Sequence, residues 1–258
     1  MKTLESIVTP KTKEYSVEQA YEGTMGPGGV YLTDLLASRL KIRPNDRVLD
    51  LGCGKVLSSC FLAKEYRALV FAFDLWVSAS ENYQRIKEKR LERRVFPIHG
   101  EAHFLPFAEN YFDKIFSLDA YQYFGTDEYY LPYLLKFLKP DGLIGIAVPS
   151  FKREIDQRNI PAHIGDLYFD DGTGYGLSAL HPAQWWKSHW EKTGSVKVLE
   201  ADELRNGYHF WVDEMNYMLE FRRDEVKRFP GAEKMYEMIR KDKGRYLGFA
   251  LVIGKKLS

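Results

Sequence analysis

Between residue 46 and about residue 149, short apolar runs bounded by turn residues alternate with segments of helical periodicity. The runs predict strands at Arg47 to Asp50, Leu69 to Asp74, Val95 to His99, Lys114 to Leu118 and Leu143 to Val148. The periodic segments between them predict helices near Val56 to Tyr66, Val77 to Arg94 and Glu128 to Leu138. This alternation is typical of βαβ units, so we expect an α/β fold with a Rossmann-like sheet and helices on both faces.

The alternation stops after Pro149. Residues 150 to 180 hold many charges, including those of Asp170 to Gly174, and few apolar runs, so we expect an insertion over the strand ends. The remaining segments predict a helix at Pro182 to Thr193, a strand at Ser195 to Glu200, helices at about Trp211 to Arg228 and Ala232 to Lys241, and a strand at Tyr246 to Gly254. The sheet is therefore expected to have seven strands. Pro140 should end the helix before strand five, and Gly142 should supply the tight turn.

The amino-acid composition argues against several classes of partner and site. The chain has 258 residues, 45% of them hydrophobic, which is enough for one domain with a full core. Its 37 basic and 36 acidic residues give a net charge of +1, so we expect neither nucleic acid nor a membrane surface as partner. The only cysteines are Cys53 and Cys60, without C-x-x-C or histidine spacing, which argues against a disulfide framework or a metal site.

No apolar run approaches the ~20 residues of a membrane span, and Met1 to Ser16 lacks the apolar core of a signal peptide. We therefore expect a cytoplasmic protein, as a monomer or homodimer.

The first predicted strand runs into a glycine turn, Val48-Leu49-Asp50-Leu51-Gly52-Cys53-Gly54-Lys55. A strand, a glycine turn and a helix form the usual unit that holds a nucleoside cofactor. The dinucleotide fingerprint G-x-G-x-x-G is absent, because Leu57 stands where its last glycine would be. The acidic residue before the glycines instead resembles motif I of the class I S-adenosylmethionine (SAM) methyltransferases. The phrase from Leu138 to Gly142 is also similar to the L-K-P-G-G turn of that family.

In an open α/β sheet, ligands bind beyond the carboxyl ends of the strands. Asp74 ends strand two, and its carboxylate can accept hydrogen bonds from both ribose hydroxyls, so we take Asp74 and the next residue, Leu75, as cofactor contacts. The alternative for Asp74 is the N-cap of the helix that starts at Val77. His99 to Phe107 resembles the family segment G-D-A-x-x-L-P-F, which implies that Glu101 and Ala102 approach the adenine.

The resemblance implies further cofactor contacts and an antiparallel strand seven. Asp50, Gly52, Cys53 and Gly54 would contact SAM in motif I, with N–H groups at the helix start facing the methionine carboxylate. Asp119 lies in the segment that follows strand four and lines the floor of the methyl-transfer site in this family.

One position departs from the family pattern D-x-G-x-G-x-G. Val56 stands in place of the third glycine, which in such loops permits close packing of helix and strand. We expect SAM binding to persist, with a shifted loop.

Methyl transfer requires alignment of nucleophile, methyl and sulfur, and a base only where the acceptor loses a proton. We take Tyr121 and His181 as the catalytic candidates, with capping of the helix after Pro182 as the competing role of His181. The other candidates for the base are Tyr21, Tyr123, His163 and His209.

Before the sheet, Tyr15 to Tyr21 and Met25 to Thr33 predict two helices joined by a glycine hinge. By resemblance, residues 1–45 form a lid, with Gly26, Gly28 and Thr33 as its contacts; a plain interhelix loop is the alternative. Residues 46–258 would then be the SAM-binding domain, with substrate-covering insertions at about 150–180 and 205–242.

The sequence thus predicts methyl transfer from SAM to a small-molecule acceptor that it does not identify. A catalytically silent SAM-binding subunit or sensor is one alternative, and a nicotinamide-dependent oxidoreductase is another. A nucleic-acid methyltransferase is disfavoured because the chain has no basic stripe.

Overall fold

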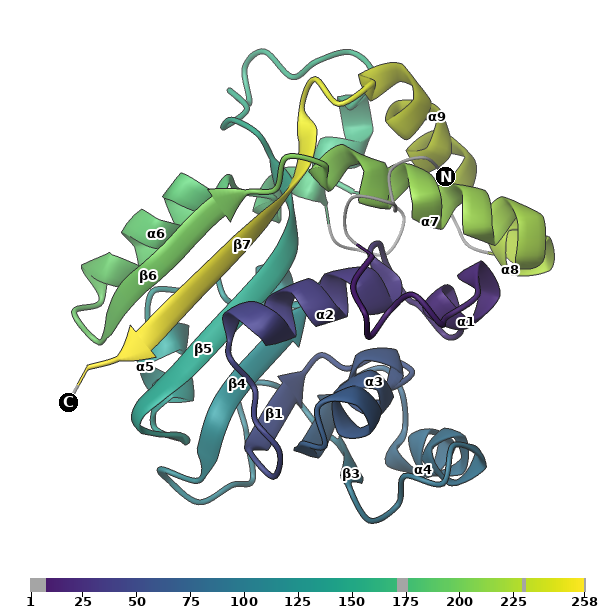
Figure 1. The fold of residues 1–258 in the computed structure, drawn as a ribbon. Helices are drawn as coiled ribbons and strands as arrows, with labels where there is room; N and C mark the ends of the chain where they lie inside the picture. The colour runs from purple at the N-terminus through teal and green to yellow at the C-terminus, as the bar shows by residue number, and fades with distance from the viewer. Residues whose placement is uncertain (1–7, 171–175, 229–230, 258) are drawn as a thin grey trace.

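A computed structural model describes residues 8–170, 176–228 and 231–257. Its centre is a seven-stranded sheet in the order β3-β2-β1-β4-β5-β7-β6 (Figure 1). The strands are β1 Arg47–Leu51, β2 Leu69–Asp74, β3 Val95–His99, β4 Phe112–Leu118, β5 Leu138–Phe151, β6 Val196–Glu203 and β7 Leu247–Lys256. The first five strands, β1 to β5, pair in parallel, whereas β7 runs antiparallel to both β5 and β6. The predicted Rossmann-like sheet with an antiparallel strand seven is confirmed.

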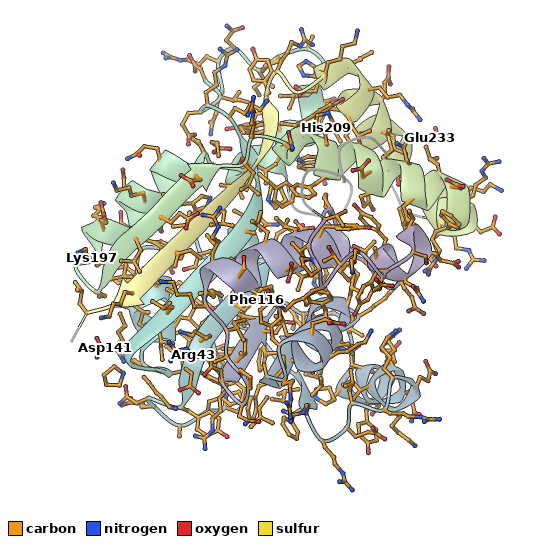
Figure 2. The ribbon with its side chains drawn as sticks, viewed as in Figure 1. Arg43, Phe116, Asp141, Lys197, His209 and Glu233 are labelled. Atoms are coloured by element: carbon orange, nitrogen blue, oxygen red, sulfur yellow. The ribbon has the colours of Figure 1, made fainter. Side chains whose placement is uncertain are left out.

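Helices cover both faces of the sheet. They are α1 Val17–Tyr21, α2 Gly29–Arg39, α3 Leu57–Glu65, α4 Ala79–Glu88, α5 Tyr130–Leu135, α6 Ala183–Lys192, α7 Gly207–Phe221, α8 Arg223–Arg228 and α9 Ala232–Asp242. Strand β7 alternates between the faces: Phe249 and Leu251 pack with α2, α3, α7 and α9, whereas Ala250 and Val252 pack with α5 and α6. This period of two explains why the strand reads as a continuous apolar run. Figure 2 shows Phe116 inside the molecule and Arg43, Asp141 and Lys197 at its periphery.

The helix expected over Val77 to Arg94 is shorter than its pattern indicates. Ser78 caps it through a capping box with Glu81, so α4 begins at Ala79. It ends after Glu88, and Arg90 has the left-handed backbone angle φ 56°. The side chains from residue 89 onward belong to the turn that leads into β3.

The turn before strand five also differs from its prediction. Helix α5 ends at Leu135 and β5 already begins at Leu138, so Pro140 does not end the helix. Asp141, not Gly142, carries the positive φ of 62°. Gly142 is needed for another reason, because a Cβ there would lie 2.6 Å from side-chain atoms of Leu138.

Two segments after strand five are broken in ways the periodicity did not indicate. The helix expected over Trp211 to Arg228 starts at Gly207 and divides at Arg222 into α7 and α8. Residues 150–180 contain the short 3-10 helices Gly165–Tyr168 and Leu177–Ala179, whereas 171–175 of the acidic glycine stretch lie outside the described residues.

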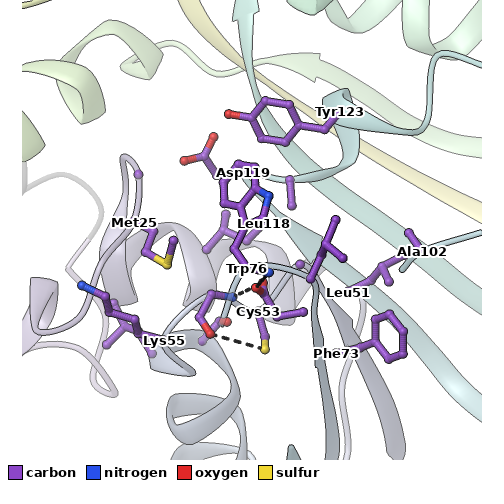
Figure 3. Close-up of a pocket in the computed structure, with 18 of the residues that line it drawn as sticks. Met25, Leu51, Cys53, Lys55, Phe73, Trp76, Ala102, Leu118, Asp119 and Tyr123 are labelled. Atoms are coloured by element: carbon purple, nitrogen blue, oxygen red, sulfur yellow. Dashed lines mark hydrogen bonds between the residues drawn. The ribbon is translucent and has the colours of Figure 1, made fainter. Parts of the chain in front are cut away.

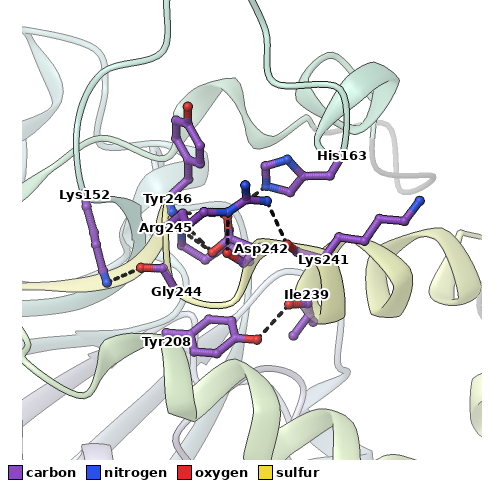
Figure 4. A network of polar contacts seen from close by, with 10 residues as sticks. Lys152, His163, Tyr208, Ile239, Lys241, Asp242, Gly244, Arg245 and Tyr246 are labelled. Atoms are coloured by element: carbon purple, nitrogen blue, oxygen red, sulfur yellow. Dashed lines mark hydrogen bonds and ion pairs between the residues drawn. The ribbon is translucent and has the colours of Figure 1, made fainter.

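The 150–180 segment is joined to the end of the chain through Asp242. This buried carboxylate accepts hydrogen bonds from the backbone N–H groups of Tyr246 and Leu247, and His163 Nε2 lies 2.9 Å from its Oδ1 (Figure 4). The segment therefore packs at the α9–β7 junction. None of its described residues lines the cavity considered below. In the described ranges, no helix is both long and apolar enough to cross a membrane.

Candidate functional site

A cavity of ≈ 300 Å³ opens at the carboxyl ends of β1, β2 and β4 (Figure 3). Its walls come from the segment before α2, the β1–α3 turn and the residues that follow β2, β3 and β4. This is the position at which open α/β sheets bind ligands, where the strand order reverses. Eight of the nine residues predicted to contact a cofactor line it: Gly52, Cys53, Gly54, Asp74, Leu75, Glu101, Ala102 and Asp119.

The β1–α3 turn needs glycine at two positions. Gly52 has φ 78° and Gly54 has φ 52°, both in the left-handed region. A Cβ at Gly52 would lie 2.2 Å from Cβ of Ala120, so the turn after β1 and the segment after β4 approach as closely as backbone allows. The glycines therefore leave backbone, not side chains, on this wall of the cavity.

Asp74 fastens that turn to the end of β2. Its Oδ2 accepts a 2.7 Å hydrogen bond from Gly54 N, and its Oδ1 accepts bonds from Trp76 N and Val77 N at 2.8 and 2.9 Å. A carboxylate has about four acceptor sites, so capacity remains for a ligand hydroxyl. The alternative role of Asp74 as a helix N-cap is wrong, because Ser78 caps α4.

Asp50 is the one predicted cofactor residue that does not line the cavity. Its side chain is fully buried, and its Oδ2 accepts 2.6 Å hydrogen bonds from the hydroxyls of Ser58 and Ser59. Burial raises its pKa to about 6, although the two hydroxyls act in the opposite direction. The structure thus places Asp50 as a support that fixes the start of α3 behind the glycine turn.

Val56 follows the backbone path that a glycine would take. It has φ 59° and ψ 24°, is buried, and stands at the N-cap of α3 without a side-chain capping bond. A β-branched residue in the left-handed region is strained. The structure thus holds Val56 in a backbone conformation that glycine would adopt without strain.

Glu101 and Ala102 lie on the wall formed after β3. The Glu101 carboxylate is 2.7 Å from His103 Nδ1 and also accepts a 3.1 Å hydrogen bond from His103 N. The pair holds the turn that leads away from β3, beside the predicted adenine side of the cavity.

Asp119 directly follows β4 and lines the cavity there. Its backbone is in the left-handed region, with φ 53°. Burial raises the pKa of its carboxyl well above the ordinary value, and repulsion from Glu214 of α7 adds to this, while a hydrogen bond from Gln122 acts in the opposite direction. Glu214 was not predicted as a site residue, since the sequence does not show which helix after β6 faces β4.

The segment before α2 covers the cavity from the side of the glycine turn. Gly26 and Thr33 line it as the lid prediction required, whereas Gly28, with φ 99°, is the N-cap of α2 and does not. A Cβ at Gly26 would lie 1.5 Å from Asp119 Oδ2, and one at Gly54 would lie 3.0 Å from Met25 Sδ. Met25 and Gly26 therefore contact two walls at once.

The structure does not bring Tyr121 or His181 to the cavity. The Tyr121 ring is fully buried, 5.6 Å from Trp186 and 5.8 Å from Trp190, on the far side of the β4 turn. His181 stacks on Trp185 at 3.7 Å, and its Nδ1 lies 2.9 Å from Glu154 Oε1.

Nor does His181 cap the helix that follows. Glu203 Oε1 accepts the hydrogen bond from Ala183 N at 2.6 Å instead. Of the other candidates for the base, Tyr123 lines the cavity, and Tyr21, His163 and His209 do not.

Trp76 is a lining residue that sequence reasoning missed, although it stands two positions after Asp74. Its ring lies 5.6 Å from that of Tyr123. Within the described part of the chain, no three His, Cys, Asp or Glu side chains are grouped so that they could hold a metal ion.

Comparison with known proteins agrees with this geometry. The model of a family described as "Methyltransferase domain" matches residues 48–142, from β1 to the turn inside β5. The glycine/sarcosine/dimethylglycine N-methyltransferase of Actinopolyspora halophila is 23% identical over 199 residues, which are 77% of this chain and 34% of that protein. The chain spans between 34% and 49% of the length of four curated relatives.

Solved structures share the fold at low identity. One is phosphoethanolamine N-methyltransferase 2 of Haemonchus contortus with phosphomonomethylethanolamine and S-adenosylhomocysteine, at TM-score 0.70 and 17% identity over 99% of this chain and 59% of that one. Another is the [4+2]-cyclase SpnF, at TM-score 0.69 and 20% identity over 87% of this chain and 79% of that one.

Proposed function

Since residues 48–142 carry a class I SAM-dependent methyltransferase domain, we propose that this chain transfers the methyl group of SAM to a small-molecule acceptor in the cavity beyond β1, β2 and β4. The observation that carries the proposal is the bond between Gly54 N and Asp74 Oδ2. It holds a carboxylate and a glycine turn on adjoining walls of one cavity, where a ribose and a methionine chain could be bound together.

The residues present fit SAM. Asp74 retains acceptor capacity for a ribose hydroxyl, and the glycine turn offers backbone close to the ligand with no Cβ in the way. Leu75, Glu101 and Ala102 form the wall proposed for the adenine. When bound there, SAM supplies a methyl group on a positively charged sulfur. The chain's own contribution is to align an acceptor with that methyl and to keep water out.

Residues 1–45 are proposed to act as the lid. Met25 and Gly26 contact the glycine turn and Asp119, so the described part of this segment closes one side of the cavity. A lid that touches both proposed ligand walls would order the acceptor and exclude solvent at the same time.

The names of two similar proteins also support a small-molecule acceptor. The Actinopolyspora enzyme is named for glycine, sarcosine and dimethylglycine, and the Haemonchus structure holds phosphomonomethylethanolamine. The cyclase with this fold is a reminder that the architecture alone does not determine the reaction. A silent SAM-binding protein is therefore the second candidate.

Turnover decides between the two. The protein is incubated with SAM and a panel of small amines, alcohols, thiols and carbon acids, and release of S-adenosylhomocysteine (SAH) is measured by mass spectrometry. Release that depends on one acceptor, and that falls in Asp74→Asn but not in Asp141→Asn, supports the transferase. Asp141 is a matched control because it lies at the start of β5, outside the cavity lining. SAM binding without release for any acceptor class would favour the silent protein.

A further inference from the structure

We propose that the end of the cavity at Asp119 is a subsite for the ammonium group of a cationic amine acceptor. Asp119 and the faces of Trp76 and Tyr123 line it, while Gln122 and Glu214 act on Asp119 from outside the cavity lining. The inference rests on the proposed function and names the chemical class of its acceptor.

Asp119 places a carboxylate on the cavity wall without a cation beside it. Among the described residues, no Lys, Arg or His side chain forms an ion pair with it. Its hydrogen bond from Gln122 Nε2 is long, at 3.4 Å. Lys55, the lysine that lines the cavity, lies 3.9 Å from Glu225 instead. A carboxylate removed from water without a counter-charge is costly, and a cationic ligand would relieve that cost.

Gln122 supplies an independent observation. Its side chain is 3% exposed, and while its Nε2 faces Asp119, its Oε1 is buried and has no hydrogen-bond partner among the described residues. An amide oxygen and a carboxylate are both acceptors, so neither can satisfy the other. Gln122 does not itself line the cavity, so it acts on the subsite by holding Asp119, and the N–H donors of a protonated amine would bind the Asp119 carboxylate.

Glu214 adds a second acid from the other side, on α7. No described side chain forms an ion pair with it, and it stands close enough to Asp119 to raise the pKa of that carboxyl by repulsion. Burial raises the pKa of Glu214 itself to about 7. Two partly buried acids that repel each other favour a positive charge between them.

The aromatic side chains favour the same ligand. The rings of Trp76 and Tyr123 lie 5.6 Å apart at an interplanar angle of 56°, and both line the cavity. Figure 3 shows Tyr123 and Asp119 at one end of the cavity, with Trp76 toward the glycine turn. Aromatic faces attract cations electrostatically through the ring quadrupole.

The subsite also accounts for the proton that an amine must lose. The bound R–NH₃⁺ gives one proton to a carboxylate, and the freed lone pair forms the new N–C bond to the methyl. The S–C bond breaks, its electron pair stays on sulfur, and the products are R–NH₂CH₃⁺ and SAH. The protonated carboxyl then returns its proton to solvent.

The methionine part of SAM also carries an ammonium, which is a second source of the same chemistry. The two sources are separated by saturating the protein with SAH, which already contributes that ammonium, before any amine is added. Binding of n-butylammonium to the SAH complex is then measured by calorimetry, with n-butanol as the uncharged analogue. The variants are Glu214→Gln and Asp119→Asn, with Glu220→Gln as the matched control on the exposed face of α7.

We expect wild type and Glu220→Gln to bind n-butylammonium at least ten-fold more tightly than n-butanol. Glu214→Gln and Asp119→Asn should each lose most of that preference, while Glu214→Gln keeps its SAH affinity within two-fold. Equal binding of amine and alcohol, no amine binding, or an unchanged preference in both variants would overturn the inference. Loss of SAH affinity in Asp119→Asn with no effect of Glu214→Gln on the amine would assign Asp119 to SAM itself and also overturn it. Failure of the proposed function is distinct, because the wild type would then not bind SAH.

Discussion

Gly26 lies directly against the carboxylate of Asp119: a Cβ built on Gly26 would be 1.5 Å from Asp119 Oδ2. The contact joins the segment before α2 to the end of β4, 93 positions along the chain, and both residues line the cavity. No side chain fits at position 26 while Asp119 keeps its place.

The Gly26→Ala variant tests this contact. Gly26 does not have the positive φ that alanine would resist, so the substitution acts through the clash alone. We expect SAH affinity to fall at least ten-fold, or about 1.4 kcal/mol, while the thermal midpoint changes little.

The double variant Gly26→Ala/Asp119→Ala provides the control, because it removes the clashing carboxylate. Adding Gly26→Ala to Asp119→Ala should cost almost nothing, which gives a large interaction energy in the double-mutant cycle. Additive losses in the four proteins would show that the lid does not act through Asp119.

Val56 gives a stability test of the left-handed position at the start of α3. Val56→Gly removes the strain of φ 59°, whereas Val56→Ala removes a similar volume and keeps much of the strain. We expect the glycine variant to be the more stable of the two by about 1 kcal/mol, the reverse of the usual order for helices. Urea unfolding midpoints measure the difference, and an alanine variant as stable as the glycine one would refute the assigned strain.

The positions of the central strands and most of the cavity residues could be predicted because both depend on local signals. Apolar runs fixed β2 and β3 to the residue, and Asp74 and Asp119 were found because strand ends meet at one edge of a parallel sheet. Asp50 could not be placed correctly, because whether it faces the ligand or Ser58 depends on the pleat of β1.

The direction in which the Tyr121 side chain points could not be predicted either. It directly follows the residues of the β4 wall, yet its ring turns into the core against Trp186. The sequence pattern could not show that Glu214 lies close to Asp119. That closeness arises from the packing of α7 on β7 and on the neighbouring helices.

Asp50 predicts a specific pH dependence of stability. Because burial raises its pKa from 3.8 to about 6, the folded state binds its proton more tightly than the unfolded state. Stability from this group is therefore fully present below pH 4 and is lost as the pH rises toward 6, by up to about 3 kcal/mol. Asp50→Asn should remove that slope. The difference in unfolding free energy between variant and wild type, measured from pH 4 to 7, should grow in favour of the variant; a constant difference would contradict the burial of a charge.

Glu214 predicts a pH dependence of amine binding. Its pKa, raised to about 7 by burial, leaves it largely protonated at pH 6 and ionised at pH 8. The affinity of the SAH complex for n-butylammonium should therefore rise across this range, since only the carboxylate attracts the cation. Calorimetry at pH 6, 7 and 8 should show the rise in wild type and in Glu220→Gln, and a flatter profile in Glu214→Gln. The same profile in all three proteins would assign the titration to another group.

We expect the cavity to bind SAM through the carboxylate of Asp74. Calorimetry of SAM binding to wild type, Asp74→Asn and Asp141→Asn, with NAD as a second ligand, tests it directly. We expect micromolar SAM binding by wild type and Asp141→Asn, a loss of about 1–3 kcal/mol in Asp74→Asn, and no binding of NAD. Binding of NAD in place of SAM would rule out the methyltransferase assignment, and SAM affinity unchanged by Asp74→Asn would rule out Asp74 as the residue that holds SAM.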